Sequence, residues 1–319
     1  MAATLLVSRR LPPMVEQRAA GSYDARLNTD DVPHSAERLL ALAEGADALL
    51  VCPGNTIDAA LIGKLPSRVK IVATYSVGYD HIDVKAAAER GIVVTNTPDV
   101  LTDATADAAI LLMLAAARRA GEGERLVRAG QWDGWRPTQL LGTHITGKRL
   151  GILGMGRIGQ AVARRARGFG MTIHYSDIRR LSPEQEQGAI FHTDPDALLG
   201  QVDVLSLHMP GGAETARFLN AARLAKLPKG AVVVNAARGT LVDDEALIAA
   251  LRSGHIAAAG LDVYANEPKL HPGYRALDNA FLLPHLGSAT VETRNAMGFR
   301  ALDNLDAFFA GKTPPDKVA

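Results

Sequence analysis

Three short segments of the chain contain the side chains that could do chemistry. They read NAARG at residues 235–239, LDVYANEP at residues 261–268 and LPHLGSAT at residues 283–290. Together they supply the guanidinium of Arg238, the carboxylates of Asp262 and Glu267, and the imidazole of His285. Reduction of a 2-keto acid requires such a set, because a cation must hold the carboxylate and polarise the carbonyl while an acid protonates the oxygen.

Each of these segments also has a plainer interpretation. Arginines and histidines at strand ends are often surface or capping residues, and a glutamate before a proline is a common turn element. All three segments, however, follow apolar runs that predict strands. Since open α/β sheets bind ligands at the carboxyl ends of their strands, the position of the segments favours a functional site.

A glycine-rich motif, GMGRIG at residues 154–159, lies between an apolar run and a helical stretch. Gly154 permits a tight turn, Gly156 lets the backbone approach a pyrophosphate, and Gly159 lets the helix pack closely on the strand. Asp177 ends the next predicted strand at about the 20-residue spacing typical of dinucleotide sites. The helix N-terminus would then present N–H groups to the phosphates. A purely structural glycine turn is the alternative.

Short apolar runs alternate with amphipathic stretches along nearly the whole chain, which is typical of βα units around a parallel sheet. Strands are expected at 4–7, 48–52, 70–74 and 92–95 in a first array, and at 149–153, 172–175, 202–207, 231–235 and 256–262 in a second. Helices are expected at 35–44, 84–90, 102–119, 161–167 and 290–309. The pattern predicts the α/β class, with two doubly wound parallel-sheet domains and a cleft between them.

Residues 121–146 fit neither array. They contain both tryptophans of the chain, Trp132 and Trp135. We interpret this stretch as an arm that packs on a partner subunit. The alternative is a surface loop whose tryptophans cover their own domain.

The composition argues against several classes of protein. The net charge of +1 does not suit nucleic acid or an anionic membrane surface as the main partner. The single cysteine, Cys52, rules out an internal disulfide and favours a reducing compartment. The longest apolar run, residues 108–117, is too short to span a bilayer, and no Cys/His pair has zinc spacing. We therefore expect a soluble, cytoplasmic protein without a metal site.

The glycine motif, the three polar segments and a fifth motif, VGYDHID at residues 77–83, occur together in an order that resembles the D-isomer-specific 2-hydroxyacid dehydrogenase family. The resemblance covers essentially the whole chain. It implies that Arg238 binds the carboxylate and carbonyl of the substrate. It also implies that Glu267 orients and charges His285, which would be the general acid/base.

The same resemblance implies the remaining contacts. The backbone N–H groups of Val77 and Gly78 would hold the substrate carboxylate, and Asp262 would lie near the nicotinamide. The implied cofactor-binding residues are Thr105, Gly154, Gly156, Arg157, Ile158, Gly159, Asp177, His208, Ala236, Asp262, His285 and Gly287. Among the other histidines, His81, His174 and His255 are expected to be packed or solvent-facing. His208 is expected to touch the cofactor without a catalytic role.

The resemblance also implies a discontinuous architecture. Residues 1–97 and 287–319 would form a flavodoxin-like substrate domain. Residues 98–286 would form a Rossmann-type dinucleotide-binding domain inserted into it. Residues 121–146 would be a dimerisation arm, so a homodimer is expected.

Within the family, WDGWRP at residues 132–137 is most similar to the glyoxylate/hydroxypyruvate reductases. The implied reaction is reduction of a small 2-keto acid to the D-2-hydroxy acid by hydride transfer from NAD(P)H. One alternative is a dehydrogenase for another 2-hydroxy acid, such as D-lactate or a sugar-derived or aryl acid. Another is a nucleotide-sensing binding protein like the corepressors that share this fold. Asp177 favours NAD, whereas Arg179 and Arg180 would suit NADP.

Overall fold

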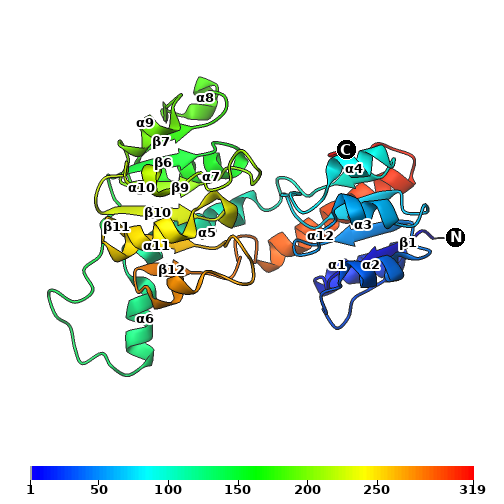
Figure 1. Ribbon diagram of the computed structural model, residues 1–319, viewed down its shortest axis with the longest axis horizontal. Coiled ribbons are helices and arrows are strands. Elements are labelled where there is room, and N and C mark those ends of the chain that lie inside the picture. Colours follow the sequence, from blue (N-terminus) through cyan, green and yellow to red (C-terminus); the bar gives the residue numbers. More distant parts are fainter. Residues whose placement is uncertain (1) are drawn as a thin grey trace. The chain divides into compact units, whose positions relative to one another are not determined.

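The computed structural model describes residues 2–319 and contains two compact units, each built on its own parallel sheet (Figure 1). The first unit runs to Leu101 and resumes at Ala289–Ala319, and the second is Thr102–Ser288. The chain passes from the first unit to the second after Leu101 and returns after Ser288, in both cases a few residues beyond the boundaries predicted from the sequence. The first of these points coincides with the start of a long helix, and the second directly precedes the last helix.

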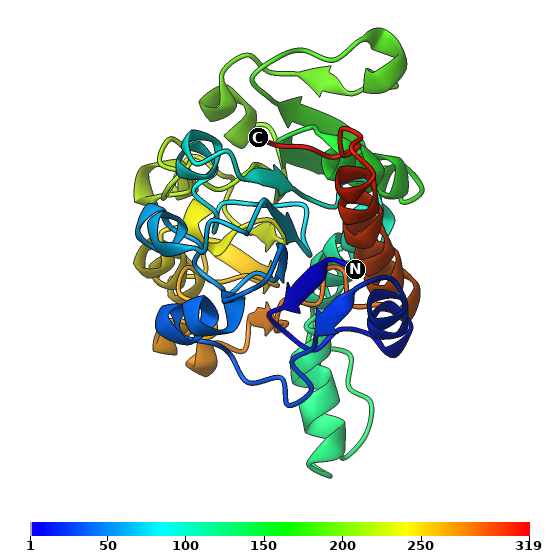
Figure 2. The ribbon, with the colours of Figure 1, turned by 90° about the vertical axis from the view of Figure 1, so that its right-hand side faces the viewer.

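The first unit has a five-stranded sheet in the order β2-β1-β3-β4-β5, with all neighbouring strands parallel. Its strands are β1 (Thr4–Val7), β2 (Asp24–Arg26), β3 (Ala48–Val51), β4 (Ile71–Thr74) and β5 (Val93–Thr95). Its helices are α1 (Pro13–Ser22), α2 (Ala36–Ala43), α3 (Ala59–Lys64), α4 (Val84–Glu89) and α12 (Val291–Phe309). Helices α1 and α12 pack together on one face, and α2, α3 and α4 cover the other (Figure 2).

Local sequence explains where these helices begin. The Ser35 side chain accepts the N–H of Arg38 and caps α2. The Thr290 side chain accepts the N–H of Thr293 and caps α12. Strand β2 was not expected, because its three residues, Asp-Ala-Arg, form a short and mostly polar edge strand.

The second unit has a seven-stranded parallel sheet in the order β12-β11-β10-β9-β6-β7-β8. Its strands are β6 (Arg149–Leu153), β7 (Thr172–Ser176), β8 (Ile190–Phe191), β9 (Val204–Leu207), β10 (Ala231–Asn235), β11 (Ile256–Leu261) and β12 (Ala280–Leu282). Its α-helices are α5 (Thr102–Ala117), α6 (Ala120–Arg128), α7 (Arg157–Arg167), α8 (Pro183–Glu186), α9 (Pro195–Leu199), α10 (Ala221–Leu224) and α11 (Asp244–Arg252). Two short 3₁₀ turns, η1 (Gly239–Leu241) and η2 (Pro272–Ala276), complete it.

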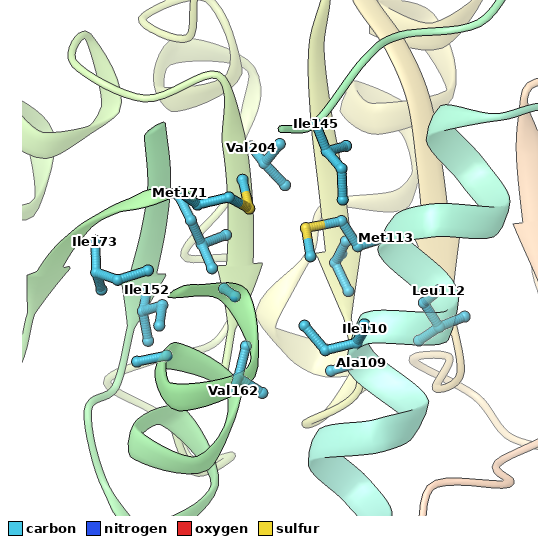
Figure 3. Packing of buried hydrophobic residues seen from close by; sticks show 14 of the residues in the cluster. Ala109, Ile110, Leu112, Met113, Ile145, Ile152, Val162, Met171, Ile173 and Val204 are labelled. Atoms are coloured by element: carbon cyan, nitrogen blue, oxygen red, sulfur yellow. The ribbon is translucent and has the colours of Figure 1, made fainter. Parts of the chain in front are cut away.

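Two apolar layers enclose this second sheet. On one face, side chains of α5 and α7 meet those of β6, β7 and β9, as Ile110, Met113, Val162, Ile152 and Val204 show (Figure 3). On the other face, α9, α10 and α11 bury a second apolar cluster. Because both faces are covered, the strands read as nearly continuous apolar runs, which made them recognisable in the sequence.

Residues 121–146 are not entirely irregular, because α6 occupies the first part of the stretch. No residue of α6 is buried, and the loop after it extends away from the second unit (Figure 1). Trp132 and Trp135 are 53% and 80% exposed. Trp135 therefore covers little of its own unit, and Trp132 is about half covered.

Within residues 2–319, no helix combines the length and the apolar character needed to cross a membrane. Within the same residues, no three His, Cys, Asp or Glu side chains are grouped so that they could hold a metal ion.

Candidate active site

The glycine motif forms the turn between β6 and α7. Gly154 has a φ of +91°, and a Cβ there would lie 2.7 Å from the carbonyl carbon of His208. At Gly159 a Cβ would lie 2.3 Å from the Gly154 oxygen, because helix and strand pack in close contact. At Gly156, by contrast, a Cβ would meet no atom within 4 Å. Two glycines are thus required by the turn itself, and the third leaves room for a ligand to approach the backbone.

The first turn of α7 adds N–H groups to this site. Gly156 is the N-cap, and Arg157 and Ile158 open an 11-residue helix with no side-chain cap. Uncapped N–H groups and the positive end of the helix dipole attract an anion. The turn therefore fits a pyrophosphate on its geometry and on its charge.

Asp177 follows the end of β7, as the sequence predicted. Its Oδ2 accepts the N–H of Met155 at 2.6 Å, so the carboxylate is fixed beside the glycine turn. Arg180 is engaged elsewhere: its Nε donates to Glu186 Oε1 at 2.8 Å, and its guanidinium lies 5.9 Å from the Phe191 ring centroid. Arg179 is exposed. Of the two arginines considered for a 2′-phosphate, one is therefore held by a carboxylate.

The imidazole and the carboxylate predicted to act together are in contact. His285 Nδ1 lies 2.7 Å from Glu267 Oε2, and both side chains are partly exposed, at 45% and 35%. Glu267 Oε1 accepts the N–H of Tyr264 at 2.9 Å. Both carboxylate oxygens are therefore occupied, which leaves Nε2 as the His285 nitrogen that faces away from this pair.

The electrostatics keep Glu267 ionised. Burial by itself would raise the pKa of Glu267, but the hydrogen bond from His285, the Tyr264 N–H and the positive charges of His285 and Arg238 together lower it below its ordinary value. A carboxylate that stays charged can only accept, so it takes the hydrogen bond from His285 Nδ1 and fixes the orientation of the ring.

Arg238 lies in a turn that directly follows β10. Asn235 organises this turn from both sides: its Nδ2 donates to the Arg238 oxygen at 2.8 Å, and its Oδ1 accepts the Ala237 N–H at 3.0 Å. The Arg238 side chain donates to the Ala237 oxygen and is partly buried. Ala236 is 9% exposed. Asn235 lies within the predicted segment, but the sequence alone does not reveal this role, because an amide that holds its own turn has no sequence signature.

The Asp262 carboxylate is enclosed by the protein and holds a loop. Its side chain is fully buried, and its two oxygens accept the N–H groups of Leu286 (2.6 Å) and Gly287 (2.7 Å). Burial raises its pKa, although those two donors oppose the shift. The carboxylate therefore holds the loop that contains His285.

Thr105 and Gly287 lie beside this contact. A Cβ at Gly287 would be 3.2 Å from Asp262 Oδ2 and 3.4 Å from Thr105 Cγ2. The structure thus brings together Thr105, Asp262 and Gly287, three residues from distant parts of the sequence that the resemblance had assigned to one cofactor site.

In the first unit, the turn at Val77 and Gly78 has the form expected of a carboxylate site. The Val77 oxygen accepts from Asn96 Nδ2 at 2.8 Å, and the Gly78 oxygen accepts from the Ser76 hydroxyl at 2.6 Å. Within residues 2–319, neither the Val77 nor the Gly78 N–H donates a hydrogen bond. The turn therefore has its carbonyls fixed and two N–H donors available to an anion.

His208 lies at the end of β9, next to the glycine turn. Its Nε2 is 2.8 Å from the Ser206 hydroxyl, and burial lowers its pKa to about 4. It is therefore neutral at pH 7, which suits a contact role. Three further histidines expected to be packed or solvent-facing have internal partners: His81 meets Thr74, His174 meets His192, and His255 meets the Leu224 oxygen.

The chain is similar to known proteins over nearly its whole length. The family described as D-isomer specific 2-hydroxyacid dehydrogenase, NAD binding domain, matches residues 110–287. A glycerate dehydrogenase of Hyphomicrobium methylovorum is 44% identical over 309 residues, 96% of each chain. A glyoxylate reductase of Thermococcus onnurineus is 44% identical over 319 residues, 98% of this chain and 95% of the other.

A solved structure shows the same likeness in three dimensions. It is an NADPH-dependent glyoxylate/hydroxypyruvate reductase from Sinorhizobium meliloti in complex with NADP and malonate. It is 36% identical, has a TM-score of 0.89, and is matched over 100% of this chain and 97% of that one. With the family matched over more than half of the chain and the relatives over nearly all of it, this protein belongs to the D-isomer specific 2-hydroxyacid dehydrogenases.

Proposed function

We propose that this enzyme reduces a small 2-keto acid, glyoxylate or hydroxypyruvate, to the D-2-hydroxy acid. The observation that carries the proposal is the 2.7 Å contact between Glu267 and His285 at neighbouring strand ends of the second unit. The names of the relatives support the substrate class: one is a glycerate dehydrogenase and the others are glyoxylate or glyoxylate/hydroxypyruvate reductases. Oxidation of glycerate at C2 gives hydroxypyruvate, so these names describe one chemistry in two directions.

In this proposal, His285 moves the proton. Glu267 keeps Nδ1 hydrogen-bonded and orients the ring, so that the protonated imidazole can donate its Nε2 proton to the carbonyl oxygen of the substrate. In the reverse direction the neutral imidazole accepts the hydroxyl proton. The reduced nicotinamide, when bound, supplies the hydride that C2 receives.

Arg238 would bind and orient the substrate. A guanidinium suits a 2-keto acid because its planar donors can hold the carboxylate and polarise the carbonyl at the same time. In the first unit, the backbone N–H groups of Val77 and Gly78 are donors that suit a carboxylate. Developing negative charge on the carbonyl oxygen would be stabilised by Arg238 as the proton arrives.

The dinucleotide would be held by the glycine turn and its surroundings. Gly154, Gly156, Arg157, Ile158 and Gly159 would hold the pyrophosphate, and Asp177 the adenosine ribose. Thr105, His208, Ala236, His285 and Gly287 would lie along the nicotinamide half. Asp262 would act there indirectly, by fixing the N–H groups of Leu286 and Gly287.

For the cofactor itself, we propose that NAD(H) is preferred over NADP(H). Asp177 places a negative charge where a 2′-phosphate would lie, and Arg180 is paired with Glu186. The relative from Sinorhizobium meliloti is NADPH-dependent, so NADP(H) is the alternative cofactor.

We also propose that the enzyme is a cytoplasmic homodimer and that residues 121–146 contact the partner. Two exposed tryptophans on a segment that extends from its unit support this arm, since an isolated apolar surface of this kind is unfavourable in water. The single, buried cysteine suits a reducing compartment. Light scattering at micromolar concentration tests the dimer, and a monomer there would exclude it.

Initial rates with a panel of 2-keto acids test the proposed function. Glyoxylate, hydroxypyruvate, pyruvate and phenylpyruvate are each offered with NADH and with NADPH. We expect glyoxylate and hydroxypyruvate to give the highest kcat/KM. A clear preference for phenylpyruvate would reassign the substrate. NADH binding without turnover of any keto acid would favour a nucleotide-sensing protein instead.

A further inference from the structure

Tyr264, which has no role in the proposed reaction, contacts the segments that hold the three proposed catalytic residues, Arg238, Glu267 and His285. Its hydroxyl lies 2.9 Å from the Leu283 oxygen and 3.3 Å from the Leu261 oxygen. These two carbonyls belong to the ends of the strand segments that lead to His285 and to Asp262. Since a hydroxyl has one proton, the shorter contact to Leu283 is the donated hydrogen bond. The side chain thus ties the two neighbouring chain segments together directly before the site.

The backbone of Tyr264 makes two further contacts. Its N–H donates to Glu267 Oε1 at 2.9 Å, on the oxygen that does not face His285. Its carbonyl carbon would lie 1.9 Å from a Cβ at Gly239, so the chain here is pressed against the Arg238 turn. Only a glycine next to Arg238 permits this approach.

We propose that Tyr264 is a positioning residue that sets the geometry of Arg238, Glu267 and His285, with its hydroxyl fixing the distance between Glu267 and His285. Glu267 follows Tyr264 by three residues, and His285 follows Leu283 by two. The hydroxyl bond to Leu283 therefore connects the two segments that must stay 2.7 Å apart at their functional ends. The inference rests on the proposed function only for its effect on turnover.

The hydroxyl is suited to this task because it remains a donor. Burial raises the pKa of Tyr264, helped by the negative charges of Asp262 and Glu267, so the group stays protonated at any physiological pH. Without it, the Leu283 carbonyl loses its partner and the Glu267–His285 contact loses a constraint.

The test compares Tyr264→Phe with Tyr274→Phe. Tyr274 is a matched control, since it is a buried tyrosine close in sequence whose hydroxyl donates to Asp244 at 2.8 Å, outside the proposed site. We expect Tyr264→Phe to lower kcat roughly ten-fold, with the dissociation constant of NADH and the KM of the keto acid changed less than about two-fold. Tyr274→Phe should lower the Tm at least as much while leaving kcat nearly unchanged.

A second measurement does not depend on activity. Carboxyl ¹³C NMR follows the titration of Glu267, whose pKa is held low by His285 and the Tyr264 N–H. We expect this pKa to move upward in Tyr264→Phe and to stay low in Tyr274→Phe. If the wild type reduces no keto acid, the proposed function fails while this titration still tests the positioning. An unchanged Glu267 titration together with an unchanged kcat would overturn the inference, as would equal losses in the two variants.

Discussion

The two halves of the proposed site in the second unit are built in different ways. The glycine turn of residues 154–159 is one continuous segment whose chemistry comes from backbone N–H groups. The Arg238, Glu267 and His285 group comes from the ends of three strands, β10, β11 and β12, and its chemistry comes from side chains. The glycine turn depends on the absence of a Cβ atom, whereas the side-chain group depends on packing between distant segments of the chain.

This difference determines how each half tolerates change. A backbone site is altered by any added Cβ, yet no side chain is needed for its charge. A side-chain site is altered by loss of one functional group, even when the backbone is untouched. We therefore expect substitutions in the first half to change cofactor affinity and those in the second to change turnover.

The largest expected effect is on turnover in His285→Ala. Loss of the general acid should lower kcat by roughly 10²–10⁴-fold, with cofactor affinity nearly unchanged. Steady-state kinetics and fluorescence titration with NADH measure the two quantities. His255→Ala is the matched control, because that imidazole is bonded to the Leu224 oxygen away from the site. Near-normal kcat in His285→Ala would remove this residue from the mechanism.

The next effect concerns Arg238→Lys, which keeps the charge and loses the planar pair of donors. We expect the KM of the keto acid to rise and kcat to fall, for a combined loss in kcat/KM of about 10²-fold. Initial-rate kinetics over a range of keto acid concentrations separate the two. An unchanged KM would mean that the substrate carboxylate is held elsewhere.

The glycine turn is tested by two alanine substitutions with opposite expectations. In Gly156→Ala the new Cβ meets no protein atom within 4 Å, so we expect a normal Tm and about ten-fold weaker NADH binding, because the ligand approach is blocked. In Gly159→Ala the Cβ would lie 2.3 Å from the Gly154 oxygen. That variant should lose about 1–3 kcal/mol of unfolding free energy or more. If Gly156→Ala binds NADH as well as the wild type does, the pyrophosphate does not lie over this residue.

Much of the fold could be predicted because the central strands are buried on both faces. β6, β9, β10 and β11 appear in the sequence as apolar runs bounded by turn residues. The strands that were not expected, β2 and β8, have three and two residues and lie at a sheet edge. Such strands have too few side chains to show a period, so only pairing with a neighbour defines them.

The site could likewise be predicted only in part from the sequence. The sequence predicted which segments would meet, since parallel strands end at one edge of a sheet. It could not predict that Asp262 is enclosed and bound to the N–H groups of a loop 24 and 25 residues away, or that Tyr264 contacts Leu283. These contacts depend on the register of β11 against β12, which no local pattern specifies. Residues that support a site are therefore harder to predict than residues that act in it.

The smallest expected effect concerns cofactor choice, which we assign to Asp177. This residue combines contact with the backbone of the glycine turn and the charge of a side chain. The carboxylate of Asp177 both accepts the Met155 N–H and places a negative charge at the end of β7. Asp177→Ala removes both, whereas Asp177→Asn keeps an acceptor and removes only the charge. We expect the wild type to prefer NADH.

Both Asp177 variants should shift the ratio of kcat/KM values toward NADPH by several-fold, because repulsion of the 2′-phosphate is lost. The asparagine variant should retain more activity with NADH, since an amide oxygen can still hold the glycine turn. Arg179→Ala, made in the wild type, controls for the exposed arginine nearby. Kinetics with each cofactor at one ionic strength give these ratios. A wild type that already prefers NADPH, and loses that preference in Arg179→Ala, would show that arginine and not the carboxylate determines the choice.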